Sequence, residues 1–233
     1  MIGYYDYTVV LTYLSLVSAG LGIFISLHGD GHPYIGIFFL LFCGLCDAFD
    51  GKVARTKKNR TEEECKFGIQ IDSLSDLVAF GVLPACIGEA VLIQSIKYPD
   101  RVIRDSGNPQ DIVAPILFFL ILMLYVLVAM IRLAYFNVQE EKRQKEEGGV
   151  RKYYEGLPVT SAALIFPAIM LFQFMTPGDM TLLYFIGMAV TGCLFVSKLK
   201  IRKPDIKGIL IMIGIGTLEF VALLILRFLS NGK

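Results

Sequence analysis

The chain has 233 residues, of which 55% are hydrophobic and 18% are charged, and its mean hydropathy is +0.62. This composition is too apolar for a soluble domain of this length and indicates an integral membrane protein. The 22 basic and 21 acidic residues leave a net charge of +1. The chain therefore lacks the overall basic field of nucleic-acid-binding proteins, and we expect no nucleic acid among its partners.

Apolar runs along the chain are long enough to cross a bilayer, which takes about 20 residues of helix. They predict an all-α, polytopic transmembrane bundle of about seven spans, with six to eight allowed. The sequence shows neither an internal repeat nor a low-complexity linker, so we expect a single domain over residues 1–233. The expected spans are roughly 8–28, 33–51, 70–96, 112–137, 158–176, 180–197 and 206–229.

The basic residues between the spans predict the orientation of the chain. The segments 52–66, 139–152 and 198–207 hold six, five and five lysines and arginines, whereas 29–33 and 177–179 hold none. Basic loops remain on the cytoplasmic side of a membrane. We therefore expect a multi-pass protein of the cell membrane with its N-terminus in the cytoplasm.

Two pairs of aspartates interrupt this apolar pattern. Asp47 and Asp50 are three residues apart at the end of the second span, and Asp72 and Asp76 are four apart at the start of the third. Each pair therefore lies on one helix face. Carboxylates near a bilayer lose hydration unless they are paired or bind a cation. The spacing predicts a metal-binding cluster at the cytoplasmic interface, whereas helix-capping or salt-bridged carboxylates are the structural alternative.

The aspartates belong to a longer motif. The pattern Asp-x-x-Asp-Gly-x-x-Ala-Arg, followed by Gly-x-x-x-Asp-x-x-x-Asp, is the signature of CDP-alcohol phosphotransferases, and the chain resembles that family at all eight fixed positions. The spacer from Thr56 to Phe67 has twelve residues and is longer than is usual in the family. Insertions in a surface connection cost little, so the spacer affects the shape of the loop rather than the chemistry.

The resemblance implies a role for each residue of the motif. CDP-diradylglycerol would be bound through its nucleotide, and two Mg²⁺ or Mn²⁺ ions would lie in each active site, where such pairs stabilise phosphoryl transfer. Asp76 would be the general base. The implied metal ligands are Asp47, Asp50, Asp72 and Asp76, and the implied nucleotide-binding residues are Asp47, Asp50, Gly51, Ala54, Arg55, Gly68 and Asp72.

The acceptor alcohol is indicated by further stretches of sequence. Residues 67–85, 132–137 and 154–160 resemble the phosphatidylserine synthase branch of the family. Arg132 lies inside an apolar run and needs an anionic partner, unless its side chain reaches water at the membrane surface. The candidates for binding serine or the lipid phosphate are Arg132, Asn137, Tyr154, Glu155 and Lys198.

The activity implied by the resemblance is transfer of a phosphatidyl group from CDP-diradylglycerol to L-serine, with release of CMP at the cytoplasmic face of the membrane. A homodimer in contact with membrane lipid is the implied assembly. Two alternatives stay open. The acceptor could instead be glycerol 3-phosphate or an inositol phosphate, for which more basic residues near the site are expected. A cation transporter with an acidic site is the more distant alternative, although transporters usually have internally duplicated halves.

Overall fold

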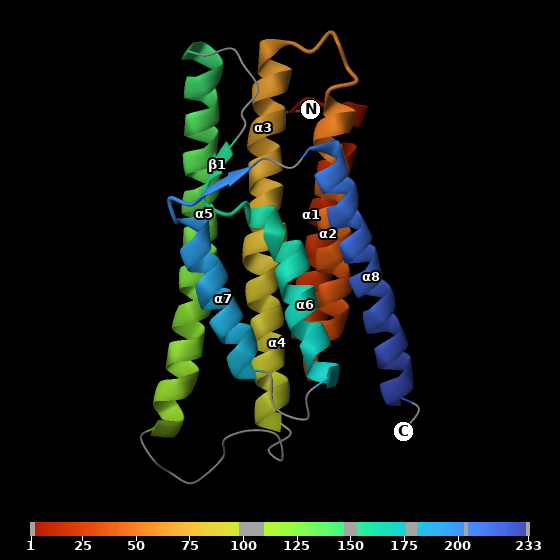
Figure 1. Ribbon diagram of the computed structural model, residues 1–233, viewed down its shortest axis with the longest axis vertical. Coiled ribbons are helices and arrows are strands. Elements are labelled where there is room, and N and C mark those ends of the chain that lie inside the picture. The colour runs from red at the N-terminus through yellow and green to blue at the C-terminus, as the bar shows by residue number, and fades with distance from the viewer. Residues whose placement is uncertain (1–2, 98–109, 147–152, 176–180, 203–204, 232–233) are drawn as a thin grey trace.

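The computed structural model describes residues 3–97, 110–146, 153–175, 181–202 and 205–231. Within these ranges the chain is almost entirely helical (Figure 1). The helices are α1 (Val10–Leu27), α2 (Pro33–Ala54), α3 (Glu62–Asp76), α4 (Leu83–Lys97), α5 (Gln110–Glu146), α6 (Ala162–Met175), α7 (Thr181–Phe195) and α8 (Ile206–Asn231). Short elements complete the described chain: the 3₁₀ turns η1 (Tyr7–Val9) and η4 (Val159–Ser161), the π-helical segment η2 (Leu77–Val82), and the strands β1 (Tyr153–Glu155) and β2 (Lys200–Arg202).

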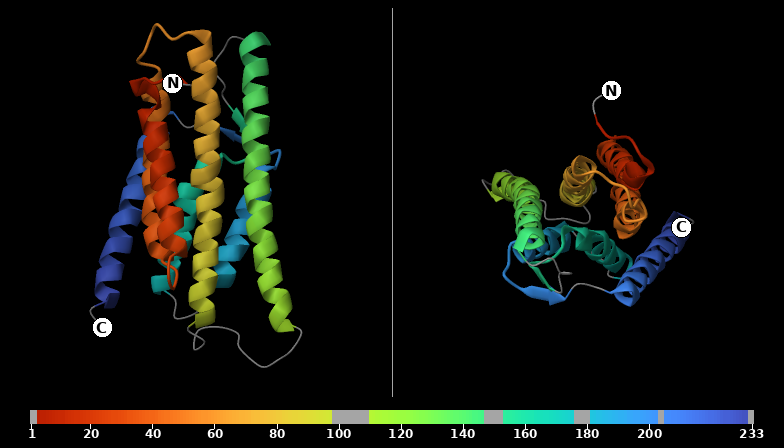
Figure 2. Two further views of the ribbon diagram at one scale, coloured as in Figure 1. Left: turned by 180° about the vertical axis from the view of Figure 1, so that it is seen from behind. Right: turned by 90° about the horizontal axis from the view of Figure 1, so that it is seen from above.

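The predicted multi-pass helical architecture is confirmed. Five helical segments of the described chain are long and apolar enough to cross a membrane, and two shorter apolar helices, Val159–Phe172 and Thr181–Phe195, accompany them. Each of the seven expected spans corresponds to one of these segments. The helices lie side by side, α1 begins at the end of the bundle opposite to that where α8 ends, and α8 packs against α6 and α2 (Figures 1 and 2).

The third span is part of a much longer rod. α3, η2 and α4 follow one another without a break from Glu62 to Lys97, although only residues 70–96 were expected to span. The rod begins early because Thr61 and Glu64 form a capping box, in which each side chain accepts a hydrogen bond from the other residue's backbone N–H. This polar first part carries Asp72 toward the second span.

A π-helical turn follows directly after Asp76 and has an identifiable cause. Pro84 has no N–H, so the carbonyl of Phe80 receives no hydrogen bond from the residue four positions later. The hydroxyl of Tyr125 on α5 donates to that carbonyl at 2.9 Å instead. The N–H of Leu83 donates to the carbonyl of Val78, which closes the wider π turn. The turn therefore joins α5 to the rod directly below the aspartates.

The segment just before the fifth span was not predicted. β1 there pairs antiparallel with β2, and the short turn η4 leads into α6 at Ala162, close to the expected start of the span near residue 158. Gly156 adopts a φ of +76°, and a Cβ atom there would lie 2.5 Å from the carbonyl oxygen of Phe195. Its N–H donates to the carbonyl of Leu199 at 2.8 Å. This close backbone approach requires glycine and prevents a helix at this point.

Candidate active site

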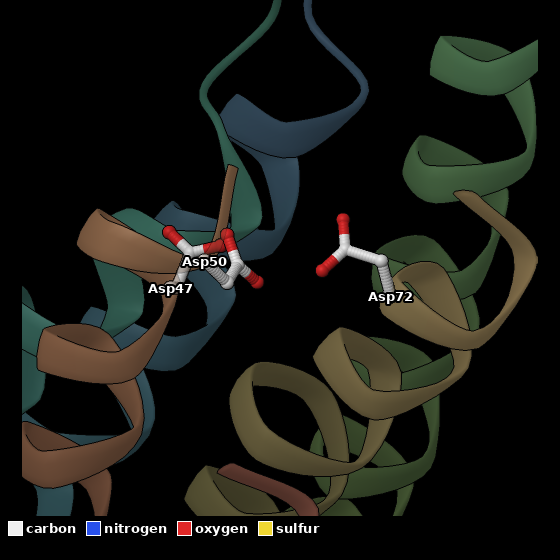
Figure 3. Close-up of side chains that lie close together, drawn as sticks. All are labelled: Asp47, Asp50 and Asp72. Atoms are coloured by element: carbon white, nitrogen blue, oxygen red, sulfur yellow. The ribbon is translucent and has the colours of Figure 1, made fainter. Parts of the chain in front are cut away.

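The motif aspartates of two different helices converge. Asp47 and Asp50, near the end of α2, face Asp72 of α3 across a short gap (Figure 3). Each residue offers a carboxylate oxygen, and these three atoms lie within 4.8 Å of one another. Asp76 lies one turn further along α3, is 8% exposed and does not belong to this group of three.

Hydrogen bonds to neighbouring helices position the α3 side of the site. The hydroxyl of Ser75 donates to the carbonyl of Thr12 on α1 at 3.1 Å. The amide of Asn137 on α5 donates to the hydroxyl of Ser73 at 2.8 Å. Ser73 and Ser75 lie between Asp72 and Asp76 in the sequence. These contacts therefore fix the helix turn that carries both aspartates.

The carboxylates of the cluster lack a counter-ion among the residues that the structure describes. In the described part of the chain, no lysine or arginine forms an ion pair with Asp47, Asp50 or Asp72. Asp50 accepts a hydrogen bond from the N–H of Gly51, its immediate neighbour. Three carboxylates at this separation repel one another unless a cation is bound between them. Their hard oxygen donors suit a divalent ion such as Mg²⁺ or Mn²⁺.

A cavity of about 750 Å³ joins this cluster to an apolar groove. Asp47, Asp72 and Asp76 line it together with three cationic side chains, Lys52, Arg55 and Arg132. Along α2 the lining extends from Arg55 to Phe38, a distance of about 25 Å at 1.5 Å per residue. Much of the apolar lining comes from α2, α6 and α8 and includes Phe38, Leu41, Phe42, Leu45, Leu164, Ile209, Met212, Ile213 and Phe220.

Two of the five acceptor candidates line this cavity. Arg132 is only 6% exposed, and its Nε donates to the carbonyl of Leu157 at 3.2 Å. Its guanidinium carbon lies 5.2 Å from the centre of the Phe136 ring. The side chain therefore faces the cavity instead of reaching water at the membrane surface. Tyr154 of β1 also lines the cavity, and its ring centroid lies 5.7 Å from that of Phe136.

The other three acceptor candidates lie outside the lining. Asn137 bonds to Ser73, and Glu155 is exposed and accepts a hydrogen bond from the hydroxyl of Tyr135 at 3.0 Å. Lys198 is exposed beyond the end of α7. Among the motif residues, Asp50, Ala54 and Gly68 also fall outside the lining residues of the cavity.

Two further residues with unusual surroundings were missed by the sequence analysis. Lys52, within the motif, lines the cavity and lies 5.3 Å from the centre of the Phe49 ring. Glu219 is 7% exposed on α8, and its Oε2 has no hydrogen-bond partner among the described residues. An acidic residue inside the apolar run 206–229 is itself a signal for a special site in a membrane helix.

Comparison with known proteins assigns the chain to a family. Residues 8–195 match the family described as CDP-alcohol phosphatidyltransferase. A relative from Saccharomyces cerevisiae, named CDP-diacylglycerol–serine O-phosphatidyltransferase, is 36% identical over 143 residues, which are 60% of this chain and 43% of the relative. The archaetidylserine synthase of Methanothermobacter thermautotrophicus is 31% identical over 199 residues, covering 85% of this chain and 70% of the relative. A Helicobacter pylori CDP-diacylglycerol–serine O-phosphatidyltransferase is 26% identical over 194 residues, or 81% and 69% of the two chains.

The matched region contains the whole aspartate motif and the helices that form the carboxylate end of the cavity. The chain spans less than half the length of the yeast relative but more than two thirds of the archaeal and Helicobacter relatives. The match extends over most of the chain, and the residues of the family motif converge in space. On these grounds the protein belongs to the CDP-alcohol phosphatidyltransferase family.

Proposed function

We propose that the protein transfers the phosphatidyl group of a CDP-diradylglycerol to the hydroxyl of L-serine and releases CMP. The observation that carries the proposal is the cavity, in which a carboxylate cluster and three cationic side chains continue into an apolar groove along α2, α6 and α8. This combination suits a substrate with a charged headgroup and hydrocarbon chains. Serine appears in the names of relatives that make different lipids, phosphatidyl and archaetidyl, which favours serine as the acceptor.

The family is metal-dependent, and we propose two divalent ions, Mg²⁺ or Mn²⁺, for the active site. Asp47, Asp50 and Asp72 would hold them, and Asp76 lies outside this group of three. When bound, such ions would neutralise the charge of the substrate diphosphate during transfer. The grouping of three oxygen donors, none of which is paired with a lysine or arginine within the described ranges, supports this assignment.

Residues around the carboxylate cluster can accept the proton and bind the anionic groups of the substrates. Asp76 lines the cavity outside the group of three, so it is available to accept the proton of the serine hydroxyl as that oxygen attacks the phosphorus. Arg132 projects a cation into the same cavity and can bind the serine carboxylate or the lipid phosphate. Arg55 lies beside Gly51, where a phosphate can approach the helix backbone.

We further propose that the active site faces the cytoplasm of the cell and that the chain forms one membrane domain, which pairs as a homodimer. The three basic segments 52–66, 139–152 and 198–207 support this orientation, because their described parts lie at the carboxylate end of the bundle (Figure 1). Cysteine labelling from either side of intact vesicles tests the orientation. Crosslinking in the membrane tests the dimer.

Other acceptors are not excluded by charge alone. Glycerol 3-phosphate or an inositol phosphate would need several basic residues at the site, and the cavity has Lys52 and Arg55 in addition to Arg132. A direct assay resolves the choice. Purified protein is incubated with CDP-diacylglycerol, Mn²⁺ and labelled serine, glycerol 3-phosphate or inositol phosphate, and CMP and the lipid product are quantified. We expect product with serine only; transfer to another alcohol in place of serine would overturn the acceptor assignment.

A further inference from the structure

The loop between α2 and α3, residues 55–61, is held in place from both sides. Lys57 Nζ lies 2.7 Å from Asp6 Oδ2 and 3.0 Å from Glu64 Oε1, so one ammonium joins the N-terminal segment to the start of α3. The hydroxyls of Tyr7 and Thr56 are hydrogen-bonded at 3.1 Å. Hydrogen bonds from Lys57 and Thr8 lower the pKa of Asp6 to about 2, so Asp6 remains an anion at neutral pH. This loop contains the first half of the long spacer of the family motif, and the second half forms the first turns of α3.

The anchored loop holds Arg60 over the backbone of Gly68. Arg60 Nη2 donates to the carbonyl of Glu64 at 3.1 Å. A Cβ atom at Gly68 would lie only 2.6 Å from the same Nη2 atom, so the guanidinium occupies the space that the missing side chain leaves. Gly68 and Asp72 are four residues apart on one face of α3. Arg60 and Gly68 are not among the residues that line the cavity, but Gly68 lies about one helical turn from Asp72, which does line it.

The guanidinium of Arg60 has donors to spare. An arginine side chain carries five N–H donors, and the contact with Glu64 uses one nitrogen. Its Nε is buried and has no hydrogen-bond partner within the described ranges of the chain. A buried donor without an acceptor is unfavourable in a native structure, and a bound ligand is one explanation for it.

Arg55 lies beside Gly51, the other glycine of the motif, as Arg60 lies beside Gly68. Arg55 Nη1 lies 3.6 Å from where a Cβ atom of Gly51 would be, and Arg55 lines the cavity. Gly51 on α2 and Gly68 on α3 are thus each faced by a guanidinium, next to the aspartates of the same helix. Guanidinium groups bind phosphate oxygens through paired N–H donors.

We infer that Arg60 is a substrate-binding residue that donates to the diphosphate of the CDP-lipid, on the side opposite to Arg55. The inference rests on the proposed function, since it requires a cytidine diphosphate at this site. It also accounts for the long spacer, because the loop that Lys57 holds in place brings Arg60 to α3. The competing explanation is that Arg60 only fastens the loop to the carbonyl of Glu64.

Binding of CDP in the presence of Mg²⁺, measured by calorimetry in detergent, separates these explanations. Arg60→Gln should weaken CDP binding about tenfold, as expected for a lost charge-assisted hydrogen bond. The Michaelis constant for CDP-diacylglycerol should rise similarly, whereas that for serine and the thermal midpoint should not change. Lys58→Gln is the matched control, because Lys58 is an exposed cation of the same loop, and it should bind CDP like the wild type.

The outcomes are distinct. If Arg60→Gln binds CDP as tightly as the wild type does, the inference is overturned and Arg60 only fastens the loop. If Arg60→Gln unfolds at a lower temperature, Arg60→Lys decides: it keeps the charge, should retain the fold and should still lose at least threefold in CDP affinity, and unchanged affinity overturns the inference. Wild-type protein that binds no CDP would contradict the proposed function itself, whereas CDP binding without transfer to serine would contradict only the acceptor.

Discussion

Asn137 of α5 donates a hydrogen bond to the hydroxyl of Ser73 of α3 at 2.8 Å, directly beside Asp72. Because its amide nitrogen is engaged by Ser73, Asn137 is a residue that positions α3 rather than one that binds the acceptor. The two residues are 64 positions apart in the sequence, and their contact joins α5 to α3 at the level of the carboxylate cluster.

Loss of this contact should reduce turnover without weakening substrate binding. Asn137→Ala removes a hydrogen bond of about 1 kcal/mol and lets the turn with Asp72 shift, so kcat should fall several-fold. The Michaelis constant for serine should stay unchanged in a steady-state assay. Tyr135→Phe is the control. Tyr135 lies on the same helix as Asn137, and this change removes its hydrogen bond to the exposed Glu155, so kcat should stay at the wild-type value. A raised constant for serine in Asn137→Ala would return Asn137 to the acceptor site.

Removal of divalent metal should abolish activity. Excess chelator should stop CMP release, and added Mg²⁺ or Mn²⁺ should restore it, because three carboxylates converge and no described lysine or arginine forms an ion pair with them. Asp72→Asn should weaken metal binding and lose most activity, whereas Glu62→Gln, which changes an exposed acid of the same helix, should do neither. Metal affinity is measured by titration calorimetry; an Asp72→Asn protein with unchanged affinity would show that Asp72 is not a ligand.

Asp76 should behave differently from the ligands. Asp76→Asn keeps the size of the side chain but removes the proton acceptor, so CMP release should fall by a factor of about 10² to 10⁴. CDP and Mn²⁺ should still bind, because Asp76 lies outside the group of three carboxylates. Parallel binding and single-turnover measurements test this distinction. Joint loss of metal binding and turnover would make Asp76 a ligand and place the base elsewhere.

Substitution of Arg132 tests which anion its guanidinium binds. Arg132→Lys keeps the cation but loses the paired donors of the guanidinium. If Arg132 binds the serine carboxylate, the Michaelis constant for serine should rise while that for the CDP-lipid stays constant, and binding of the lipid phosphate should give the reverse pattern. We expect the first result. If both constants equal those of the wild type, Arg132 is not part of the substrate site.

We expect the buried side chain of Glu219 to destabilise the folded protein. Its buried Oε2 has no hydrogen-bond partner within the described segments, and such a group destabilises a fold by about 1–3 kcal/mol. Glu219→Leu should therefore raise the thermal midpoint in detergent and leave transfer to serine intact. Leu218→Ala, on the exposed side of the same helix, provides the comparison. A lower midpoint together with lost activity in Glu219→Leu would instead assign Glu219 to the substrate groove.

Much of the fold follows from local sequence. Long apolar runs predict spans because the bilayer requires internally hydrogen-bonded helices, and each of the seven expected runs corresponds to an apolar helix. The β1–β2 pair was not predictable in this way. Tyr154 and Ile201 are neighbours only because the chain folds back between α7 and α8, and neither strand has the length or alternation that marks a strand in sequence.

The aspartate motif was recognisable because its spacing is local. Residues three or four apart share a helix face in any helix, so Asp47 with Asp50, and Asp72 with Asp76, could be paired before the structure was known. The convergence of Asp47, Asp50 and Asp72, and the position of Asp76 outside this group, depend on where α2 and α3 lie in the bundle.

The sequence by itself therefore determined the membrane class, the spans, the family motif and the chemistry of its carboxylates. The tertiary structure alone decided which candidates reach the cavity: Arg132 and Tyr154 line it, whereas Asn137, Glu155 and Lys198 do not. It also brought Arg60 over Gly68 and buried Glu219 without a partner. The physical reason is that helical periodicity fixes neighbours on one helix, while contacts between helices arise from packing of residues far apart in the chain.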